Sequence, residues 1–143
     1  MNDLATRNPL IRDLTEDEAW AELRRAPYGR LGVTAIDQAD IFPINFVVDD
    51  RVIYFRTAPG SKLLELTVNP RVALEVDEFT AEECLSVVVH GVAEELERQD
   101  EIDAADLLNL RAWFPTLKYR WVRVVPGFVR GTSFQRTGEP ERY

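Results

Sequence analysis

The 143-residue sequence predicts a mainly β protein, a small antiparallel β-barrel of six or seven strands with a few short helices. Apolar residues alternate with polar ones in several runs, and short turns separate most of these runs. Helical segments do not alternate with every strand, which argues against a parallel, doubly wound sheet. The length suits a single domain, residues 1–143, without repeats or linkers.

Residues 1–27 are predicted as an N-terminal extension that ends in the first helix. Thr15 and Glu18 have the spacing of a capping box, in which each side chain accepts a hydrogen bond from the other residue's backbone N–H. An apolar face continues to Leu23. Ala26-Pro27 ends the helix, because a residue before proline is disfavoured in helical conformation.

Two strands are predicted next, over residues 29–36 and 41–48, with a turn at 37–40 between them. Pro43 indicates an edge strand or a bulge, because proline has no N–H to donate to a ladder. In the second strand, one face is predicted to consist of Phe42, Ile44, Phe46 and Val48.

The middle of the chain predicts a hairpin, a short helix and another strand. Asp49-Asp50 is typical of a hairpin turn, and residues 51–57 form the strand after it. Residues 61–68 are predicted as a helix that ends before Asn69-Pro70. Residues 71–77 then return to strand periodicity.

In the last third of the chain, residues 85–96 are predicted as one long strand and residues 101–110 as a short helix. Two final strands over 118–126 and 127–135 and a loose tail over 137–143 follow. Gly91 interrupts the long strand and predicts a bulge or a bend there.

The composition limits the class of protein. A net charge of -8 argues against nucleic acid as the main partner, since binding to a phosphate backbone requires an extended positive surface. No apolar run is long enough to span a bilayer, and the N-terminus lacks the apolar core of a signal peptide. The single cysteine, Cys84, suits a reducing compartment. We therefore expect a cytoplasmic protein without a membrane partner.

Most chemical motifs are missing from the sequence. It contains neither a Rossmann glycine fingerprint nor a P-loop, and neither a nucleophile elbow nor a zincin motif. One histidine, His90, and one cysteine leave no His/Cys metal cluster, so no metal is expected. His90 lies within a strand and is interpreted as a surface or barrel-wall residue. No side chain is identified as catalytic.

The stretch RTAPGSKL, residues 56–63, gathers two cations and two hydroxyls around one turn. Ser61 can cap the following helix, which places Lys62 in its first turn, where a cation opposes the helix dipole. A bound anion would remove this conflict, because helix N–H groups, Arg56, Thr57, Ser61 and Lys62 would all face it. The alternative is an exposed turn with two solvated cations.

Around this turn the sequence IFPINFVVDDRVIYFRTAPGSKLLELTVNPRVALEVDEF, residues 41–79, resembles the FMN-binding split β-barrel proteins related to pyridoxamine 5'-phosphate oxidase. It is most similar to the short members of this family that include nitroimidazole-reductase-like proteins. The similarity extends from Tyr28 through HGVAEEL and, more weakly, into PGFVRGTSF. The resemblance implies a split β-barrel and an FMN cofactor.

The resemblance also implies a set of cofactor-binding residues and an assembly. The FMN phosphate would be bound by Arg56, Thr57, Ser61 and Lys62, and the isoalloxazine ring would lie beside Pro43, Ile44 and Asn45. Family members are typically homodimers with the flavin in a cleft between protomers. Candidates for closing that cleft from the second chain are Trp113, Phe114 and Trp121, with ordinary core or interface packing as the alternative.

The function implied is an FMN-dependent oxidoreductase that acts on a small organic substrate with electrons from a nicotinamide or another donor. The C-terminal arginine-and-histidine substrate motif of the true oxidase is not found, so vitamin B6 oxidation is not expected. Two alternatives stay open. One is a reductase that uses the deazaflavin F420, and the other is a flavin- or haem-binding module without turnover, with His90 as the available haem ligand.

Overall fold

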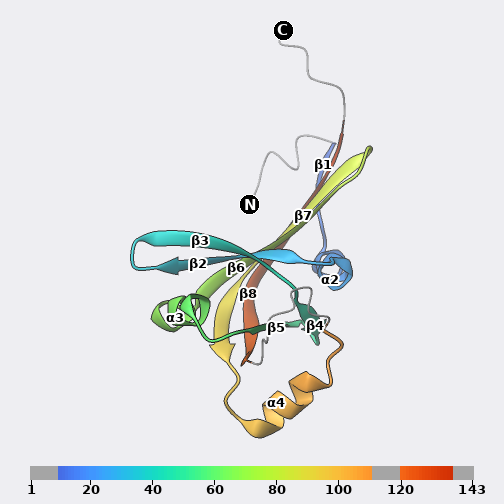
Figure 1. Ribbon diagram of the computed structural model, residues 1–143. Helices are drawn as coiled ribbons and strands as arrows, with labels where there is room; N and C mark the ends of the chain where they lie inside the picture. The colour runs from blue at the N-terminus through green and yellow to red at the C-terminus, as the bar shows by residue number, and fades with distance from the viewer. Residues whose placement is uncertain (1–9, 111–119, 137–143) are drawn as a thin grey trace.

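Eight strands form one antiparallel sheet in the computed structural model of the protein, which describes residues 10–110 and 120–136 (Figure 1). The strands are β1 (Ile11–Asp13), β2 (Gly29–Ala35), β3 (Gln38–Ile44), β4 (Val47–Asp49), β5 (Val52–Thr57), β6 (Arg71–Phe79), β7 (Glu83–Glu95) and β8 (Arg120–Gln135). The helices are α2 (Glu16–Arg25), α3 (Ser61–Val68) and α4 (Gln99–Asp106). The predicted mainly β antiparallel fold is confirmed. None of the described helices has the length and hydrophobicity required to cross a bilayer.

The strand order β3-β2-β6-β7-β8-β5-β4 places consecutive strands β3 and β4 at opposite ends of the sheet, while β1 pairs with β8. Asn45 and Phe46 connect these two ends, so the chain itself draws the sheet into a barrel. The predicted single strand over residues 41–48 is therefore wrong. Its first half pairs with β2 and its second half pairs with β5. The prediction from Pro43 of an edge strand is confirmed, since β3 ends the strand order.

Helix α2 begins and ends as the sequence predicts. Thr15 is the N-cap, and both hydrogen bonds of the capping box with Glu18 are present. The helix ends at Arg25, with Ala26 as the C-cap before Pro27. Its buried residues Ala19, Trp20 and Leu23 pack into the main core, which fills the inside of the barrel.

Turns and helix ends deviate from the predictions by a few residues. The first hairpin turns at Ile36 and Asp37 rather than over 37–40, and β3 already begins at Gln38. The second hairpin turns at Asp50 and Arg51, both with positive φ, one residue later than predicted. Helix α3 covers the predicted residues, but α4 covers 99–106 instead of 101–110.

Strand β8 replaces the two final strands predicted over residues 118–126 and 127–135. Pro126-Gly127, at the boundary between those two predicted strands, lies inside β8, because the β7–β8 register shifts at His90/Gly91 and accommodates the extra residue as a bulge. This merger removes one predicted strand, whereas the short strand β1 and the separation of β3 from β4 each add one. The structure therefore has eight strands instead of six or seven. The tail, residues 137–143, lies outside the described residues.

The predicted irregularity at Gly91 is confirmed, and its cause is a close backbone approach. A Cβ on Gly91 would lie 2.5 Å from the carbonyl oxygen of Val125, closer than real Cβ contacts allow. Gly127, on the other side of the bulge, has room, because a Cβ there would lie 3.7 Å from the carbonyl oxygen of His90.

We therefore predict that Gly91→Ala destabilises the protein by about 2–4 kcal/mol, because β7 and β8 must separate to admit the methyl group. Gly127→Ala is the matched control and should change stability by less than about 1 kcal/mol. Urea unfolding followed by circular dichroism measures both. Equal losses in the two variants would contradict the assignment of the steric limit to Gly91.

Candidate functional site

The predicted anion-binding turn lies between β5 and α3. Arg56 and Thr57 end β5, and α3 begins at Ser61 with Gly60 as its N-cap. The prediction that Ser61 caps the helix is wrong, because Ser61 is already the first helical residue. No side chain caps α3, and its first turn contains no acidic residue. The N–H groups at this end therefore present a partial positive charge without a capping side chain.

Arg56 is half-buried and points toward the segment after α4. Its Nη2 donates to the carbonyl oxygen of Leu110 at 3.1 Å, and its guanidinium carbon lies 5.2 Å from the centroid of the Trp121 ring. Trp121 stands directly opposite Arg56 in the β5–β8 register. The Trp121 Nε1 in turn donates to Asp106 Oδ1 at 2.7 Å. Two contacts thus orient Arg56, and the second of them is to a Trp121 ring that Asp106 holds in place.

Trp121 is one of the three aromatic residues considered for closing a cleft from a second chain. In this structure it is 3% exposed and packs within its own chain against Leu96 and Ala105. Its place is therefore the second, smaller core under α4. Trp113 and Phe114 lie outside the described residues.

Lys62 connects the turn to strand β3. Its Nζ lies 4.6 Å from the centroid of the Phe42 ring, a cation–π distance. Phe42 precedes the predicted ring-edge residues Pro43, Ile44 and Asn45. The structure therefore brings Lys62 beside that strand, whereas Arg56 has its partners near α4.

The three predicted ring-edge residues have different exposures. Pro43 is exposed, Ile44 is buried in the core and Asn45 is half-buried. Asn45 Nδ2 donates a long hydrogen bond of 3.5 Å to the carbonyl oxygen of Pro27. Phe46 is buried and Phe42 packs against the core, so the predicted inner face of this segment is confirmed.

Thr57 is also placed at the turn, but its side chain is mostly enclosed. It is 7% exposed, and its Oγ1 donates to the carbonyl oxygen of Ala58 at 3.3 Å. The hydroxyl proton is thus used within the turn.

The sequence reasoning missed a pair of carboxyl groups near the turn. Desolvation raises the pKa of Glu65 on α3, and the neighbouring Asp40 carboxyl on β3 raises it further, while Lys62 acts in the opposite direction. Lys62 therefore stands in a mixed field and not in a purely cationic one. The spacing of Lys62 and Glu65 on α3 is visible in the sequence, but the approach of Asp40 is not.

A broad groove crosses the outer face of the sheet over β3, β2, β6, β7 and β8, with a volume of about 620 Å³. The register aligns one residue from each strand across it, namely Ile41, Gly32, Ala73, His90 and Phe128. Ile41 on the edge strand β3 is 71% exposed and Phe128 on β8 is 56% exposed, so two large apolar side chains of this face are open to solvent.

His90 lies on this outer face, as the interpretation of a barrel-wall residue requires. It is exposed, and its ring centroid lies 6.2 Å from that of Phe128. Among the described residues, no cluster of three His, Cys, Asp or Glu side chains has the geometry of a metal site. Cys84 is buried.

Comparison with known proteins adds three findings. A model of the pyridoxamine 5'-phosphate oxidase family matches residues 15–133. The crystal structure of a candidate pyridoxamine 5'-phosphate oxidase from Corynebacterium glutamicum is similar, with 42% identity, a TM-score of 0.84, and coverage of 92% of this chain and 98% of that one. An FAD-binding protein from Mycobacterium smegmatis has 36% identity, a TM-score of 0.75, and coverage of 87% and 98%.

A curated relative is similar over a shorter part of the chain. An uncharacterized protein of Mycobacterium tuberculosis is 35% identical over 96 residues, which are 67% of this chain and 87% of the relative.

We predict that Asp106→Ala destabilises the protein by about 1–3 kcal/mol, because the buried Trp121 Nε1 then loses its acceptor. Asp106→Asn keeps an acceptor oxygen and should recover most of that loss. Asp103→Ala, an exposed aspartate of the same helix, is the control and should cost less than about 1 kcal/mol. Equal destabilisation by Asp106→Ala and Asp103→Ala, measured by urea unfolding, would show that the Trp121 contact is unimportant.

Proposed function

Since this chain belongs to the pyridoxamine 5'-phosphate oxidase family, we propose that it binds a flavin and acts as an oxidoreductase on a small organic substrate. The observation that carries the proposal is the β5–α3 turn. There, a helix N-terminus without a side-chain cap lies next to Lys62, and Lys62 contacts the edge strand that would face the flavin ring. A ligand that carries a phosphate group and a planar ring requires an anion site of this kind close to a strand edge.

The turn fits a phosphate by its chemistry. The N–H groups of α3 supply hydrogen-bond donors, and Lys62 supplies a compact positive charge in the first turn of the helix. Arg56, at the end of β5, would add a planar guanidinium by exchanging its contact with the Leu110 carbonyl for one with the phosphate. In a protein of net charge -8, these local groups have to overcome the general negative field.

The edge strand fits the ring. Strand β3 pairs with β2 on one side and ends the described sheet on the other, so backbone N–H and C=O groups around Pro43 and Ile44 are available to a polar ring edge. Asn45 adds an amide that both donates and accepts. When bound, the flavin would supply the hydride or electron transfer, and the protein would supply binding and orientation.

FMN is the flavin that we propose, because one terminal phosphate matches the single turn of cations and helix N–H groups. The Mycobacterium smegmatis relative is an FAD-binding protein, so FAD is the direct comparison for a binding experiment. Strand β3 and the turn lie on the same side of the barrel as α3 (Figure 1), which would allow one ligand to reach both.

We also propose a homodimer that buries the outer groove. Its apolar residues Ile41, Val92 and Phe128 are 71%, 47% and 56% exposed, and exposed apolar patches of this kind mark protein interfaces. The groove includes β3, so a partner seated on it would approach the proposed flavin ring. A second copy of the chain would then complete the cofactor cleft.

The flavin proposal predicts that the Arg56→Ala, Lys62→Ala double variant binds FMN at least about 30-fold more weakly, because two charge-assisted contacts to the phosphate are lost. Riboflavin, which lacks the phosphate, should lose less than about threefold. Quenching of flavin fluorescence on titration measures both affinities, and a parallel titration with FAD identifies the preferred flavin.

Arg98→Ala, an exposed arginine at the start of α4 that pairs with Asp100, is the control for the loss of positive charge. It should leave FMN affinity unchanged. Unchanged FMN affinity in the double variant would refute the phosphate site, and absence of binding by any flavin to the unaltered protein would refute the function itself.

The dimer proposal predicts that Ile41→Asp yields monomers, because a carboxylate in the apolar groove has no partner to compensate its desolvation. Ile36→Asp changes the same residue type in the same hairpin but outside the groove, and it should leave the dimer intact. Size-exclusion chromatography with light scattering measures both masses. Dimers of Ile41→Asp, or monomers of the unaltered protein, would contradict the assignment.

A further inference from the structure

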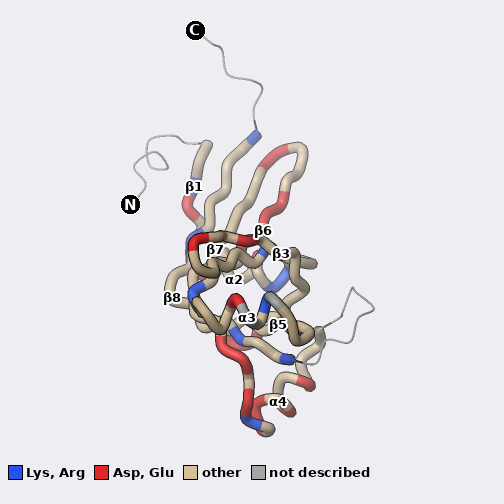
Figure 2. The backbone as a smooth tube through the Cα atoms, turned by 60° about the vertical axis from the view of Figure 1, so that its left-hand side comes forward, with Lys and Arg blue, Asp and Glu red and all other residues tan. Residues whose placement is uncertain are grey.

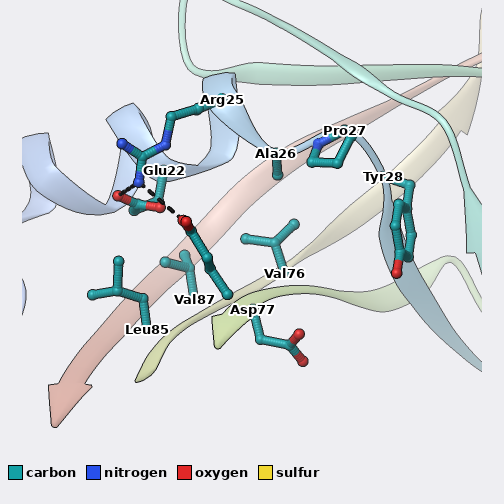
Figure 3. A pocket seen from close by; sticks show the side chains of 10 residues that line it. Glu22, Arg25, Ala26, Pro27, Tyr28, Val76, Asp77, Leu85 and Val87 are labelled. Carbon is teal, nitrogen blue, oxygen red and sulfur yellow. Dashed lines mark hydrogen bonds and ion pairs between the residues drawn. The ribbon is translucent and has the colours of Figure 1, made fainter. Parts of the chain in front are cut away.

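A pocket of about 390 Å³ lies between the C-terminal end of α2 and the β6–β7 hairpin (Figure 3), and its size suits a small organic molecule. Figure 3 shows the Tyr28 ring on one side of the pocket and the Arg25–Glu22 pair on the other, with Val76 between them. The floor is apolar, because Val76 and Val87 belong to the main core.

The strand register creates this pocket. Pairing between β2 and β6 stops at Arg30 and Glu75, and within the described chain the residues of β6 beyond that point pair with β7 alone. Helix α2 ends at Arg25, and residues 26–28 lead away from it to β2. The outer end of the β6–β7 ladder is therefore flanked by the end of α2 and by residues 26–28, and not by a further strand.

The wall beside α2 carries two carboxylates and one guanidinium. Arg25 forms an ion pair with Glu22 and a second one, at 3.1 Å, with Glu78 Oε2. The side chain of Glu22 is 18% exposed, so it is held close to the floor of the pocket. One positive charge is shared by two negative charges here, which leaves this wall negative.

A similar arrangement surrounds Asp77, which lines the pocket. Arg30 Nη1 lies 2.7 Å from Glu75 Oε1 and 3.0 Å from Asp77 Oδ2. Burial raises the pKa of Glu75, and the nearby Asp77 carboxyl raises it further against the opposing effect of Arg30. The pocket is therefore lined by three carboxyl groups, those of Glu22, Asp77 and Glu78, and by the guanidinium group of Arg25. Arg30 contacts Asp77 from outside this lining.

The pocket also adjoins the strand proposed to face the flavin ring. Pro27, a lining residue, accepts the hydrogen bond from Asn45 Nδ2. Arg30, which holds Asp77 in the pocket wall, stands directly opposite Pro43 in the β2–β3 register. Both ends of the ring-edge segment thus contact or pair with residues around the pocket.

From this geometry we infer that the pocket binds a small organic cation, an ammonium group carried on an apolar body of about the size of a phenyl ring. The body would lie against Pro27 and Leu85, above the buried Val76 and Val87, and the ammonium group would lie among the lining carboxylates, which include Asp77 and Glu78. Tyr28 lies on one side of this space (Figure 3). This last step rests on the flavin function proposed above: small organic cations are then the class of substrate, and the pocket places them next to the flavin ring.

The test is a titration of the full-length protein without flavin, followed by isothermal calorimetry. The probes are 2-phenylethylammonium and 3-phenylpropionate, which have similar bodies and opposite charges. We expect the ammonium probe to bind at least about tenfold more tightly than the carboxylate, with an affinity that falls as salt screens the charges. Equal affinities, or preference for the carboxylate, would overturn the inference.

Variants assign the binding to this pocket. Asp77→Asn and Glu78→Gln should each weaken binding of the ammonium probe about three- to tenfold, while Glu97→Gln, an exposed glutamate outside the pocket, should leave it unchanged. Circular dichroism verifies that the variants fold. Ammonium affinity that is equal in all three variants would place the cation elsewhere and refute the assignment.

Addition of FMN separates the two proposals. With flavin bound, the ammonium probe should shift the visible absorption of the flavin, and Glu78→Gln should reduce that shift at a given probe concentration. A protein that binds the probe but no flavin would refute the proposed function and support the cation site. A protein that binds FMN without any spectral response to saturating probe would refute the place of the cation next to the ring.

Discussion

The ladder between β7 and β8 extends from the Glu83–Gln135 pair to the Glu95–Val122 pair, and the other strands of the sheet are arranged on its two sides. Strand β6 adds to one side of this pair, and β5 and β1 add to the other. The bulge at Gly91 lets two long strands bend together around one core, because a bulge increases the local twist.

This closure is what assembles the candidate site. Strand β5 ends in Arg56 and Thr57, and α3 returns across the barrel so that Lys62 meets Phe42 on β3. A helix end, a cation and an exposed strand edge come together although 20 residues separate Phe42 from Lys62 in the chain. In the function that we propose, the phosphate and the ring of one ligand would be bound here, because the two elements are fixed by the same core.

Charge has different roles in different parts of the molecule. Acidic side chains gather on α4, on the segment before it and on the β6–β7 hairpin (Figure 2), where most of them are solvated. Near the turn, Lys62 opposes the acid pair of Asp40 and Glu65. At the pocket under α2, carboxylates outnumber guanidinium groups. The two proposals thus assign an anion and a cation to different places of one acidic protein, and β3 lies beside both places.

The sequence by itself determined the elements whose signals are local. The capping box of α2, the extent of α3, the alternation along the strands and the irregularity at Gly91 depend on neighbouring residues, and they agree with the structure. The turn RTAPGSKL also stands out locally, through the types of residue it gathers. The helix cap at Ser61 was wrong because helix starts differ by single residues that propensity does not resolve.

The tertiary structure decided everything that depends on contacts between distant segments. Only the register showed that β8 passes through Pro126-Gly127 and that residues 41–48 belong to two sheet edges. Arg56, Trp121 and Asp106 lie on three separate elements, β5, β8 and α4. Their contacts therefore cannot be predicted from the spacing of residues in the sequence. The pocket beside α2 arises where β2 leaves β6, and a sequence contains no signal for where two strands part.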